Sequence, residues 1–261
     1  MIAFLTDWGY DRYYVGIAKA VVREINRDVE ILDICHNIKP FSVRHAAHVI
    51  ERAIKDLPAD TVFLAVVDPG VGTSRKPVAM VLKNGMCMVG PDNGIFTLAA
   101  ESFGVHEVRE LENRQYHRGV SRSFHGRDIF APVAAHIAKG LAVEKLGSRL
   151  MNFEYLKYRK ATRSGDALTG EVAFYDGFGN LETNIPLSLG TGLEEGDILE
   201  LSRGRKQFTI TFGNTYYDVN FGQLMAHFDS SGYMEITVNK GSARELLGMD
   251  EGEQITVVKA R

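Results

Sequence analysis

The first half of the chain alternates short apolar runs with segments whose apolar residues recur every three to four positions. The runs Ile2–Leu5 and Val29–Ile34 have the length and composition of strands, and a helical stripe over residues 15–25 lies between them. A second helical stripe over residues 43–57, preceded by Ser42 as a cap, leads into the buried-strand run Val62–Val67. This order predicts β-α-β units and a parallel sheet.

Two further segments modify and extend this sheet. Val78–Leu82 and Met86–Val89 flank Asn84-Gly85, which supplies the positive φ angles of a tight primed turn, so we predict a hairpin with an antiparallel strand. An apolar stripe over residues 129–141 predicts a helix that begins just after the segment Phe124-His-Gly-Arg-Asp128. Pro132 lies close enough to the start of this helix to be tolerated.

The pattern changes near Leu150, where short strand-like runs separated by turns predict a small β-barrel or sandwich. These runs are Gly170–Phe174, Asp197–Leu201, Gln207–Phe212, Tyr233–Val238 and Gln254–Val258. We therefore predict an α/β N-terminal domain with a mainly parallel sheet over residues 1–155 and a polar linker over residues 156–168. A smaller all-β, barrel-like C-terminal domain follows over residues 169–261.

Composition narrows the classes of partner. The 261 residues, 45% of them hydrophobic, can bury a large core. Lys and Arg number 30 against 33 Asp and Glu, a net charge of -3, which disfavours nucleic acid as a partner. The N-terminal apolar run lacks a basic leader and ends too soon for a signal peptide or a membrane span, so we expect a cytoplasmic protein with no membrane partner.

Cysteine and histidine give no strong disulfide or metal signal. Cys35 and Cys87 lie in apolar, strand-like runs, where a lone thiol behaves as a small buried hydrophobe. His45 and His48 are three residues apart on one predicted helix, but no carboxylate lies at matching spacing. We interpret both histidines as structural or surface residues and expect no metal.

Two carboxylates follow predicted parallel strands, where the loops of an open α/β sheet converge on ligands. Asp7 follows the first strand, and Asp68 opens the Gly-rich loop Asp68-Pro-Gly-Val-Gly72, which leads to Arg75. Asp is also a common turn and cap residue. For Asp68 we favour a functional role, because its loop can bring backbone amides and one permanent cation close to a small ligand. A phosphate-binding loop is the competing interpretation, but it is weakened because the loop lacks the Gly-Lys-Ser/Thr ending of a Walker motif.

Other candidates are weaker when taken singly. His125 lies at a predicted helix start, where the helix dipole lowers the basicity of an imidazole, but taken alone it is better explained as a capping or packing residue. The segment Asp176-Gly-Phe-Gly-Asn180 gathers a carboxylate, an amide and an aromatic ring around two glycines, a mixture that a compact small-molecule site needs. Tyr216 and Ser230 are candidates of the same kind.

Together these residues resemble the S-adenosylmethionine hydroxide adenosyltransferases, the family that includes the bacterial fluorinase and chlorinase. The resemblance runs through nearly the whole chain, in dispersed stretches that keep the same order. They are Thr6-Asp7, Asp33-Ile-Cys-His36, Asp68-Pro-Gly-Val-Gly72 with Arg75, Gly90-Pro-Asp-Asn-Gly94, Phe124-His-Gly-Arg-Asp128, Asp176-Gly-Phe-Gly-Asn180 and Ser230-Ser-Gly-Tyr233. The resemblance implies an α/β domain, a β-barrel domain, and a homotrimer whose active sites lie at subunit interfaces.

The resemblance also implies roles in binding the substrate. Asp7 would hold the ribose hydroxyls, which suits a carboxylate because it accepts two hydrogen bonds at once. Phe41 would lie beside the sugar, where the halogenases carry a tryptophan. The remaining contacts come from the second half: Asp176 and Ser230 at the amino acid end, Asn180 at the adenine edge, and Phe178 and Tyr216 as apolar or stacking surface.

The nucleophile is the sharpest distinction within the family. The halogenases carry tyrosine at the positions of Asp68 and His125, whereas this sequence has the Asp68, Arg75 and His125 combination of the water-using branch. Gly126 falls where the fluorinase has a halide-binding serine. The resemblance therefore implies hydrolysis of S-adenosyl-L-methionine to adenosine and L-methionine, by attack of water or hydroxide on ribose C5′.

This reaction would need no metal or organic cofactor, because the sulfonium departs as a neutral thioether. Supplying hydroxide is the difficult step, since free water has a pKa near ~15.7. Arg75 can stabilise the developing anion, while Asp68 and His125 can orient the water and accept its proton. We favour His125 as the acceptor, or a hydroxide shared by all three residues. Two alternatives stay open: a halide-using adenosyltransferase, and a protein that binds an adenosyl ligand without turnover.

Overall fold

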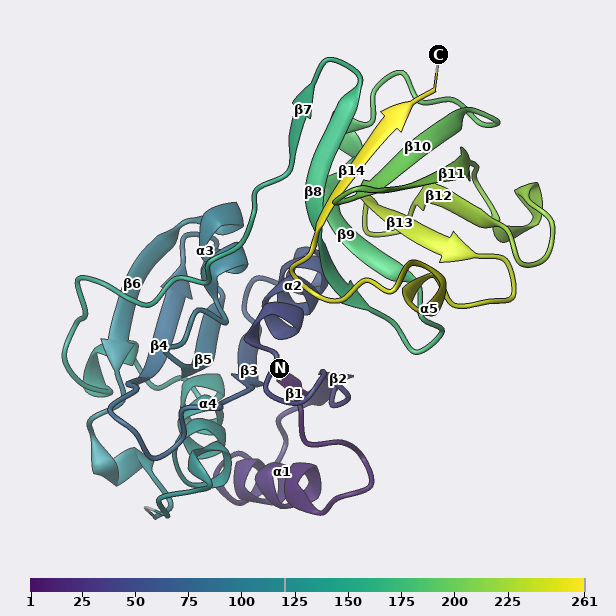
Figure 1. The fold of residues 1–261 in the computed structure, drawn as a ribbon. Helices are drawn as coiled ribbons and strands as arrows, with labels where there is room; N and C mark the ends of the chain where they lie inside the picture. The colour runs from purple at the N-terminus through teal and green to yellow at the C-terminus, as the bar shows by residue number, and fades with distance from the viewer. Residues whose placement is uncertain (120, 261) are drawn as a thin grey trace. The chain divides into compact units, whose positions relative to one another are not determined.

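A computed structural model describes residues 1–119 and 121–260 and divides the chain into two compact units, Met1–Leu156 and Lys157–Arg261 (Figure 1). We call them unit 1 and unit 2. The predicted C-terminal domain ends at Arg261, which lies outside the described residues. Strand β7 (Thr162–Ser164) falls within the segment predicted to be a linker and pairs with the first long strand of unit 2. In the described part of the chain, no helix is both long enough and apolar enough to cross a membrane.

Unit 1 contains a six-stranded sheet with the strand order β2-β1-β3-β5-β4-β6. Its strands are β1 (Ile2–Thr6), β2 (Ile31–Cys35), β3 (Val62–Val66), β4 (Pro77–Leu82), β5 (Cys87–Pro91) and β6 (Val105–Glu110). β1 is parallel to β2 and β3, and β3 is parallel to β5, whereas β4 is antiparallel to both of its neighbours. The predicted mainly parallel sheet and the hairpin of β4 and β5 are confirmed. The predicted primed turn is wrong, because Gly85 has a φ of +95° but the φ of Asn84 is not positive.

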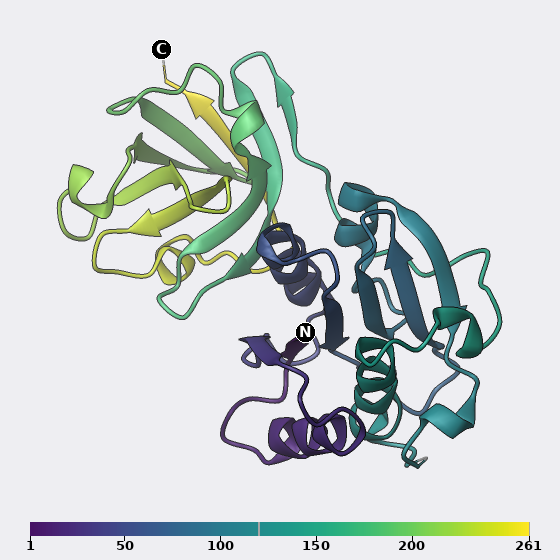
Figure 2. The same cartoon turned by 180° about the vertical axis from the view of Figure 1, so that it is seen from behind.

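Helices cover both faces of this sheet (Figures 1 and 2). On β1, Ile2 and Phe4 point into one hydrophobic core while Ala3 and Leu5 point into the other, as the two-residue period of a strand requires. The first core is completed by α1 (Tyr14–Ile25) and α4 (Ala131–Ala138), and the second by α2 (Val43–Ala53) and α3 (Thr97–Phe103). Unit 1 is therefore a three-layer α/β/α sandwich.

Local sequence explains where two of these helices begin. Ser42 Oγ accepts a hydrogen bond from the backbone N–H of His45 (3.1 Å) and so caps α2 as predicted. α4 is preceded by a π-helical turn, η3 (Gly126–Phe130), so helical structure starts directly after His125, and Pro132 falls in the first turn of α4. π-helical turns are rare and often occur at functional sites. Short 3₁₀ turns in unit 1 are η1 (Ile54–Asp56), η2 (Arg114–Tyr116) and η4 (Val143–Lys145).

Unit 2 is a closed seven-stranded β-barrel. Its strands follow the order β14-β10-β11-β12-β13-β9-β8, and the antiparallel pairing of β8 with β14 closes the ring. Its elements are β8 (Ala167–Tyr175), β9 (Leu181–Pro186), η5 (Leu187–Leu189), β10 (Ile198–Arg203), β11 (Lys206–Phe212), η6 (Tyr216–Asp218), β12 (Leu224–Phe228), β13 (Tyr233–Val238), α5 (Ala243–Leu247) and β14 (Gln254–Lys259). The predicted barrel-like domain is confirmed, and closure of the ring excludes the sandwich.

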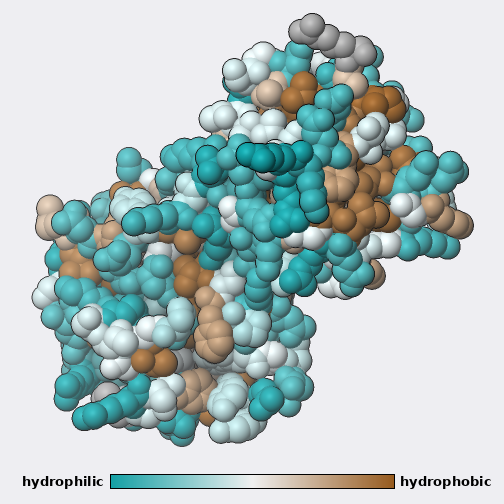
Figure 3. Space-filling model, viewed as in Figure 1, coloured by the Kyte–Doolittle hydropathy of each residue, from teal (hydrophilic) through white to brown (hydrophobic). Residues whose placement is uncertain are grey.

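Two barrel strands, β9 and β12, have no counterpart among the predicted runs. The centre of β9 is polar, yet Thr183 and Asn184 are buried and bonded to backbone carbonyls. Thr183 Oγ1 donates to the carbonyl of Met234 (2.7 Å), and Asn184 Nδ2 donates to that of Arg159 (2.5 Å). Apolar side chains otherwise fill the cores, and hydrophilic residues dominate the face seen in Figure 3.

Candidate active site

A cavity of about 460 Å³ opens in unit 1 at the carboxyl ends of β1 and β3, beside the start of η3. The predicted residues Asp7, Phe41, Asp68 and His125 all line it, although they come from four separate segments of the chain. The carboxyl ends of parallel strands and the start of a helical segment meet here, as expected for a ligand site in an open α/β sheet.

Asp68 and Arg75 form a buried ion pair at this cavity. Arg75 Nε donates to Asp68 Oδ1 (3.1 Å), Arg75 Nη2 donates to Asp68 Oδ2, and the two side chains are 6% and 7% exposed. The loop between them turns at Gly72, whose φ is +79° and where a β-carbon would come within 2.6 Å of the carbonyl oxygen of Arg122. Because a guanidinium only donates, Asp68 accepts with both oxygens and is a carboxylate in this arrangement.

Arg75 also joins His125, since its Nη2 lies 3.1 Å from His125 Nδ1. The guanidinium can only donate, so Nδ1 accepts, and a neutral ring then carries its hydrogen on Nε2. Burial and the neighbouring guanidinium lower the pKa of His125 below its usual value. His125 is therefore neutral near pH 7 and its second nitrogen is a hydrogen-bond donor.

Burial affects both members of the Asp68–Arg75 ion pair. Burial raises the pKa of Asp68, and the charge and hydrogen bonds of Arg75 offset part of this rise. The guanidinium lies over the ring of Phe130, 5.3 Å from its centroid. Its remaining nitrogen, Nη1, is buried and has no hydrogen-bond partner within residues 1–119 and 121–260. We call Asp68, Arg75 and His125 the polar trio.

Asp7 and Phe41 are linked through the backbone. Asp7 Oδ2 accepts a hydrogen bond from the backbone N–H of Phe41 (2.9 Å), and burial raises the pKa of Asp7. Phe41 has a φ of +67°, uncommon for a bulky residue, and its side chain is 71% exposed. The hydrogen bond to Asp7 helps to hold this conformation, so the amide of Phe41 belongs to the site together with its ring.

Aromatic residues that the sequence analysis did not single out complete the wall. Trp8 makes edge-to-face contacts with Phe4, Tyr14 and Phe124, at centroid distances of 5.8, 6.5 and 5.3 Å. A β-carbon at Gly126 would come within 2.5 Å of the Trp8 ring. The available signal was adjacency in the sequence, because Trp8 follows Asp7, and Phe124 and Gly126 flank His125.

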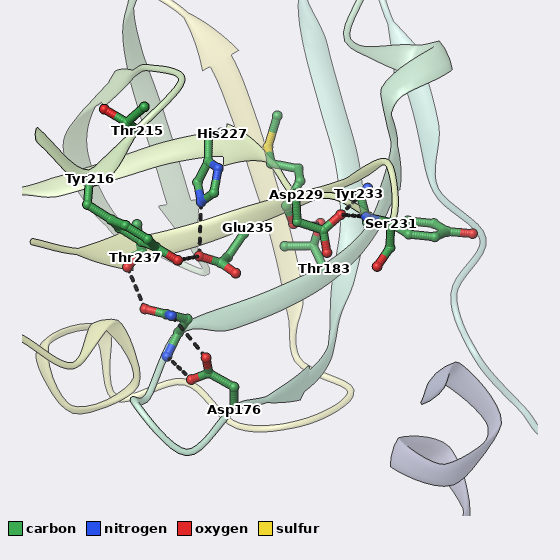
Figure 4. A network of polar contacts seen from close by, with 12 residues as sticks. Asp176, Thr183, Thr215, Tyr216, His227, Asp229, Ser231, Tyr233, Glu235 and Thr237 are labelled. Atoms are coloured by element: carbon green, nitrogen blue, oxygen red, sulfur yellow. Dashed lines mark hydrogen bonds and ion pairs between the residues drawn. The ribbon is translucent and has the colours of Figure 1, made fainter. Parts of the chain in front are cut away.

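A second cavity, of about 540 Å³, lies in unit 2 and is lined by Phe178, Asn180 and Tyr216 together with residues 237–241. Asn180 Oδ1 accepts from the Thr237 hydroxyl, and Asn180 Nδ2 donates to Asp176 Oδ2 (3.0 Å; Figure 4). Asp176 Oδ1 also accepts from the backbone N–H groups of Phe178 and Asn180, both at 2.9 Å. Asp176 therefore orders the loop and fixes which side of the Asn180 amide donates.

Tyr216 is held by a buried carboxylate. Its hydroxyl donates to Glu235 Oε1 (3.2 Å), which also accepts from His227 Nε2 (3.0 Å; Figure 4). Burial and the negative charge of Glu235 raise the pKa of Tyr216 to about 12. Tyr216 is thus a neutral aromatic wall of this cavity at physiological pH.

Ser230 is not brought to either cavity wall. It lies in the exposed turn between β12 and β13, where Asp229 Oδ1 accepts from the backbone N–H groups of Ser231 and Tyr233 (2.9 and 2.8 Å; Figure 4). Thr237, beside Asn180, is near the other end of β13. Asp176, Phe178, Asn180 and Tyr216 therefore form one group, and Ser230 stands apart from it.

The two cysteines and the histidine pair of α2 are buried or half-buried in unit 1. Burial lowers the pKa of His45 to about 4 and that of His48 to about 3, so these are structural rather than surface residues. Cys35 and Cys87 are unpaired, and burial raises the pKa of Cys87 to about 12. Over the described ranges, no group of three or more His, Cys, Asp or Glu side chains is arranged to hold a metal ion.

The chain combines an α/β/α unit that carries the polar trio with a closed barrel that carries an aromatic-lined cavity, an arrangement typical of two-domain proteins that bind a small molecule. Residues 2–147 match the SAM hydroxide adenosyltransferase N-terminal domain, and residues 170–256 match the corresponding C-terminal domain. The chain belongs to the SAM hydroxide adenosyltransferase family.

Individual relatives agree with this assignment. A protein of Salinispora tropica named (R)-S-adenosyl-L-methionine hydrolase is 37% identical, over 98% of this chain and 97% of its own. A fluorinase of Actinopolyspora mzabensis is 25% identical, over 100% of this chain and 97% of its own. The crystal structure of an uncharacterized conserved protein from Thermotoga maritima superimposes with a TM-score of 0.94 at 48% identity, covering 99% of this chain and 100% of that one.

Proposed function

We propose that this protein hydrolyses S-adenosyl-L-methionine to adenosine and L-methionine. The observation that carries the proposal is the polar trio: Asp68, Arg75 and His125 form one hydrogen-bonded group at a cavity that Asp7 also lines. The relative of Salinispora tropica that bears the name of this activity supports it as well.

The proposed chemistry is an in-line displacement at ribose C5′. The bond from the water oxygen to C5′ forms as the C5′–S bond breaks, and the bonding electrons pass to sulfur, which leaves as the neutral thioether of methionine. Because an anion and a sulfonium neutralise each other in the transition state, a desolvated pocket lowers the barrier. The residues of the site must therefore hold a hydroxide ion, or a water molecule that is losing its proton, next to C5′ in a desolvated pocket.

We assign the proton of the attacking water to Asp68. His125 is the acceptor favoured from the sequence, but its Nδ1 already accepts from Arg75 and its Nε2 carries the ring hydrogen, so the neutral ring has no free acceptor. Asp68 has unused lone pairs, and burial makes it more basic than an exposed Asp. In this mechanism His125 donates from Nε2 to the water oxygen, and Arg75 stabilises the charge that develops on it.

Substrate contacts follow the two cavities. We propose that Asp7 binds the ribose hydroxyls next to Phe41, that Asn180 contacts the adenine edge, and that Phe178 and Tyr216 supply apolar surface. Asp176 and Ser230 stay predictions for the amino acid end of the substrate. Following the resemblance, the assembly is a homotrimer in which one subunit's α/β domain and its neighbour's barrel share each active site. The cytoplasmic location also stays a prediction.

We further propose that the reaction uses no metal or organic cofactor, because a neutral thioether leaves without a Lewis acid or a general acid. Turnover should then be unchanged after exhaustive dialysis against a chelator. Loss of activity on dialysis, with recovery on adding back one metal ion, would overturn this part of the proposal.

Use of a halide in place of water is less well supported. Position 126 carries no side chain, and the Trp8 ring occupies the space that one would need. The wall next to His125 therefore offers no hydroxyl donor at that position to a desolvated anion. Incubation with chloride or fluoride, followed by a search for 5′-halo-5′-deoxyadenosine, tests this alternative.

Chromatography of S-adenosyl-L-methionine incubated with the purified protein tests the main proposal. We expect adenosine and methionine in equal amounts from the wild type, and a loss of at least ~100-fold in kcat for Asp68→Ala. Asp60→Ala, a change of an exposed carboxylate in the same unit, is the matched control and should leave the rate unchanged. Tight binding of the substrate with turnover no faster than background would instead favour a non-catalytic binding protein.

A further inference from the structure

His36 belongs to the motif Asp33-Ile-Cys-His36, which the proposed function leaves without a role. Its side chain is fully buried, and both ring nitrogens are hydrogen-bonded. Nε2 lies 3.1 Å from Asp33 Oδ1, and Nδ1 lies 2.8 Å from Thr6 Oγ1. A histidine buried and bonded on both sides within one unit is fixed in one orientation.

The direction of each hydrogen bond in this group follows from chemistry. The carboxylate of Asp33 only accepts, so His36 donates from Nε2, and its Nδ1 accepts from the Thr6 hydroxyl. Asp33 Oδ2 accepts from Lys19 Nζ on α1 (2.5 Å). Burial lowers the pKa of His36 more than Asp33 raises it, which agrees with a neutral ring. One chain of hydrogen bonds thus runs from α1 through β2 to the end of β1.

This chain of hydrogen bonds ends on the segment that lines the cavity. Thr6 Oγ1 accepts from the backbone N–H of Trp8 (3.3 Å), and the carbonyl of His36 accepts from the backbone N–H of Gly9 (2.7 Å). His36 therefore holds the segment from Thr6 to Gly9 with its ring and with its carbonyl. Asp7 and Trp8, which line the cavity, lie between these two attachments.

We infer that His36 is a positioning residue, which acts through Thr6 to keep Asp7 and Trp8 directed into the cavity. His36 does not itself line the cavity, and its hydrogen bonds reach the cavity wall through Thr6 and Gly9. The kinetic part of this inference rests on the proposed function, in which Asp7 binds the ribose. Because that contact is made equally in the ground state and in the transition state, its loss raises KM and leaves kcat nearly unchanged.

Four variants separate the two sides of the imidazole. His36→Ala and Thr6→Val should each raise KM at least ~10-fold with kcat within ~3-fold of the wild type. His36→Asn, whose amide reaches the position of Nδ1, should keep the bond to Thr6 and restore KM to within ~3-fold of the wild type. His36→Gln, whose amide reaches the position of Nε2 and so faces Asp33, should behave like His36→Ala.

Thr61→Val is the matched control, because Thr61 is a fully buried threonine of unit 1 whose hydroxyl has no hydrogen-bond partner in the described part of the chain. It should leave KM at the wild-type value. Trp8 is the single tryptophan of the chain, so acrylamide quenching of its emission reports on this segment without any turnover. Quenching should increase in Thr6→Val and His36→Ala but not in His36→Asn or Thr61→Val.

Wild-type KM and wild-type quenching in Thr6→Val would overturn the inference. An equal rise of KM in Thr61→Val, or no difference between His36→Asn and His36→Gln, would overturn it as well. If the wild type fails to hydrolyse S-adenosyl-L-methionine, the proposed function fails, and the quenching comparison still decides the role of His36.

Discussion

Arg75 lies between the other two members of the polar trio, and this position determines the state of both. It fixes the carboxylate form of Asp68 and assigns the hydrogen of His125 to Nε2. The sequence reveals the three residue types and their order. It does not reveal the tautomer, because that depends on one 3.1 Å contact between segments fifty residues apart.

The state of His125 sets the pH dependence. Protonation would place an N–H of His125 against an N–H of Arg75, so kcat/KM should be level above about pH 7 and fall on the acid side. The midpoint of this fall should lie below 6.5, because burial and Arg75 lower the pKa of His125. In His125→Asn the part of the acid limb that comes from protonation of the imidazole should be absent. A wild-type midpoint above 6.5 in a pH–rate profile is the result that this account does not allow.

Position 126 is restricted to glycine because the ring of Trp8 occupies the space that a β-carbon would need. Gly126→Ala would place a β-carbon within 2.5 Å of that ring, and three other aromatic rings surround Trp8. We expect a loss of ~1–3 kcal/mol in the free energy of unfolding, measured by calorimetry, and a fall in kcat/KM of at least ~10-fold.

A second substitution separates this clash from a general effect of alanine. In the Trp8→Leu background, Gly126→Ala should cost less than half as much as in the wild type. Gly16→Ala, where a β-carbon meets nothing within 4 Å, is the control and should be neutral or stabilising. Equal costs of Gly126→Ala in both backgrounds would mean that Trp8 is not the obstacle.

Among the elements, the helical segment after His125 depends on Asp128. Its side chain is 4% exposed and accepts from the backbone N–H of Ser121 (2.9 Å) and from Arg127 Nε (2.6 Å). Burial raises the pKa of Asp128, but these donors outweigh burial and lower it to about 2. The carboxylate therefore stabilises the fold fully above its unfolded pKa of 3.8, and this contribution is lost as the pH falls toward 2.

Asp128→Asn should accordingly lower the free energy of unfolding of unit 1 by ~2 kcal/mol at neutral pH. Its difference from the wild type should shrink below about pH 4, where the wild-type carboxylate begins to lose its advantage. Urea unfolding followed by the emission of Trp8 measures unit 1 specifically. A difference of the same size near pH 3 and near pH 7 would show that charge on Asp128 is not the cause.

Hydrophobic periodicity predicted the elements that pack apolar faces, including the β-α-β pattern of unit 1 and its hairpin. It missed β9, because Glu182, Thr183 and Asn184 are polar and buried in the middle of that strand. Their partners come from other strands and from the segment before β7, and no local pattern reports such pairing. The candidate site likewise contains residues that local sequence predicts and residues that it does not. Asp7 and Asp68 could be predicted because they follow strands, whereas Trp8 is recognised only from its packing.

At the scale of the whole molecule, each unit exposes large aromatic side chains near its cavity. Phe41 and Tyr13 are 71% and 68% exposed in unit 1, and Phe178 and Tyr217 are both 82% exposed in unit 2. Exposed aromatic residues around a cavity are typical of surfaces that become covered on binding or assembly. They support the proposal that active sites are completed between subunits.

Native mass spectrometry should therefore give the mass of three chains. Phe178→Ser should weaken the trimer and raise KM, while Leu246→Ser, a change of an exposed apolar residue on α5, should alter neither. A wild-type monomer with full activity would contradict the shared active site and would leave the roles of the polar trio intact.

The most direct test of the central claim is hydrolysis of S-adenosyl-L-methionine in water enriched in ¹⁸O. Attack of water on C5′ predicts one ¹⁸O atom in the 5′-hydroxyl of adenosine and none in methionine, with labelled adenosine formed at least ~100-fold more slowly by Asp68→Ala. Adenosine without label at O5′, or label in another product only, would contradict the mechanism built on the polar trio.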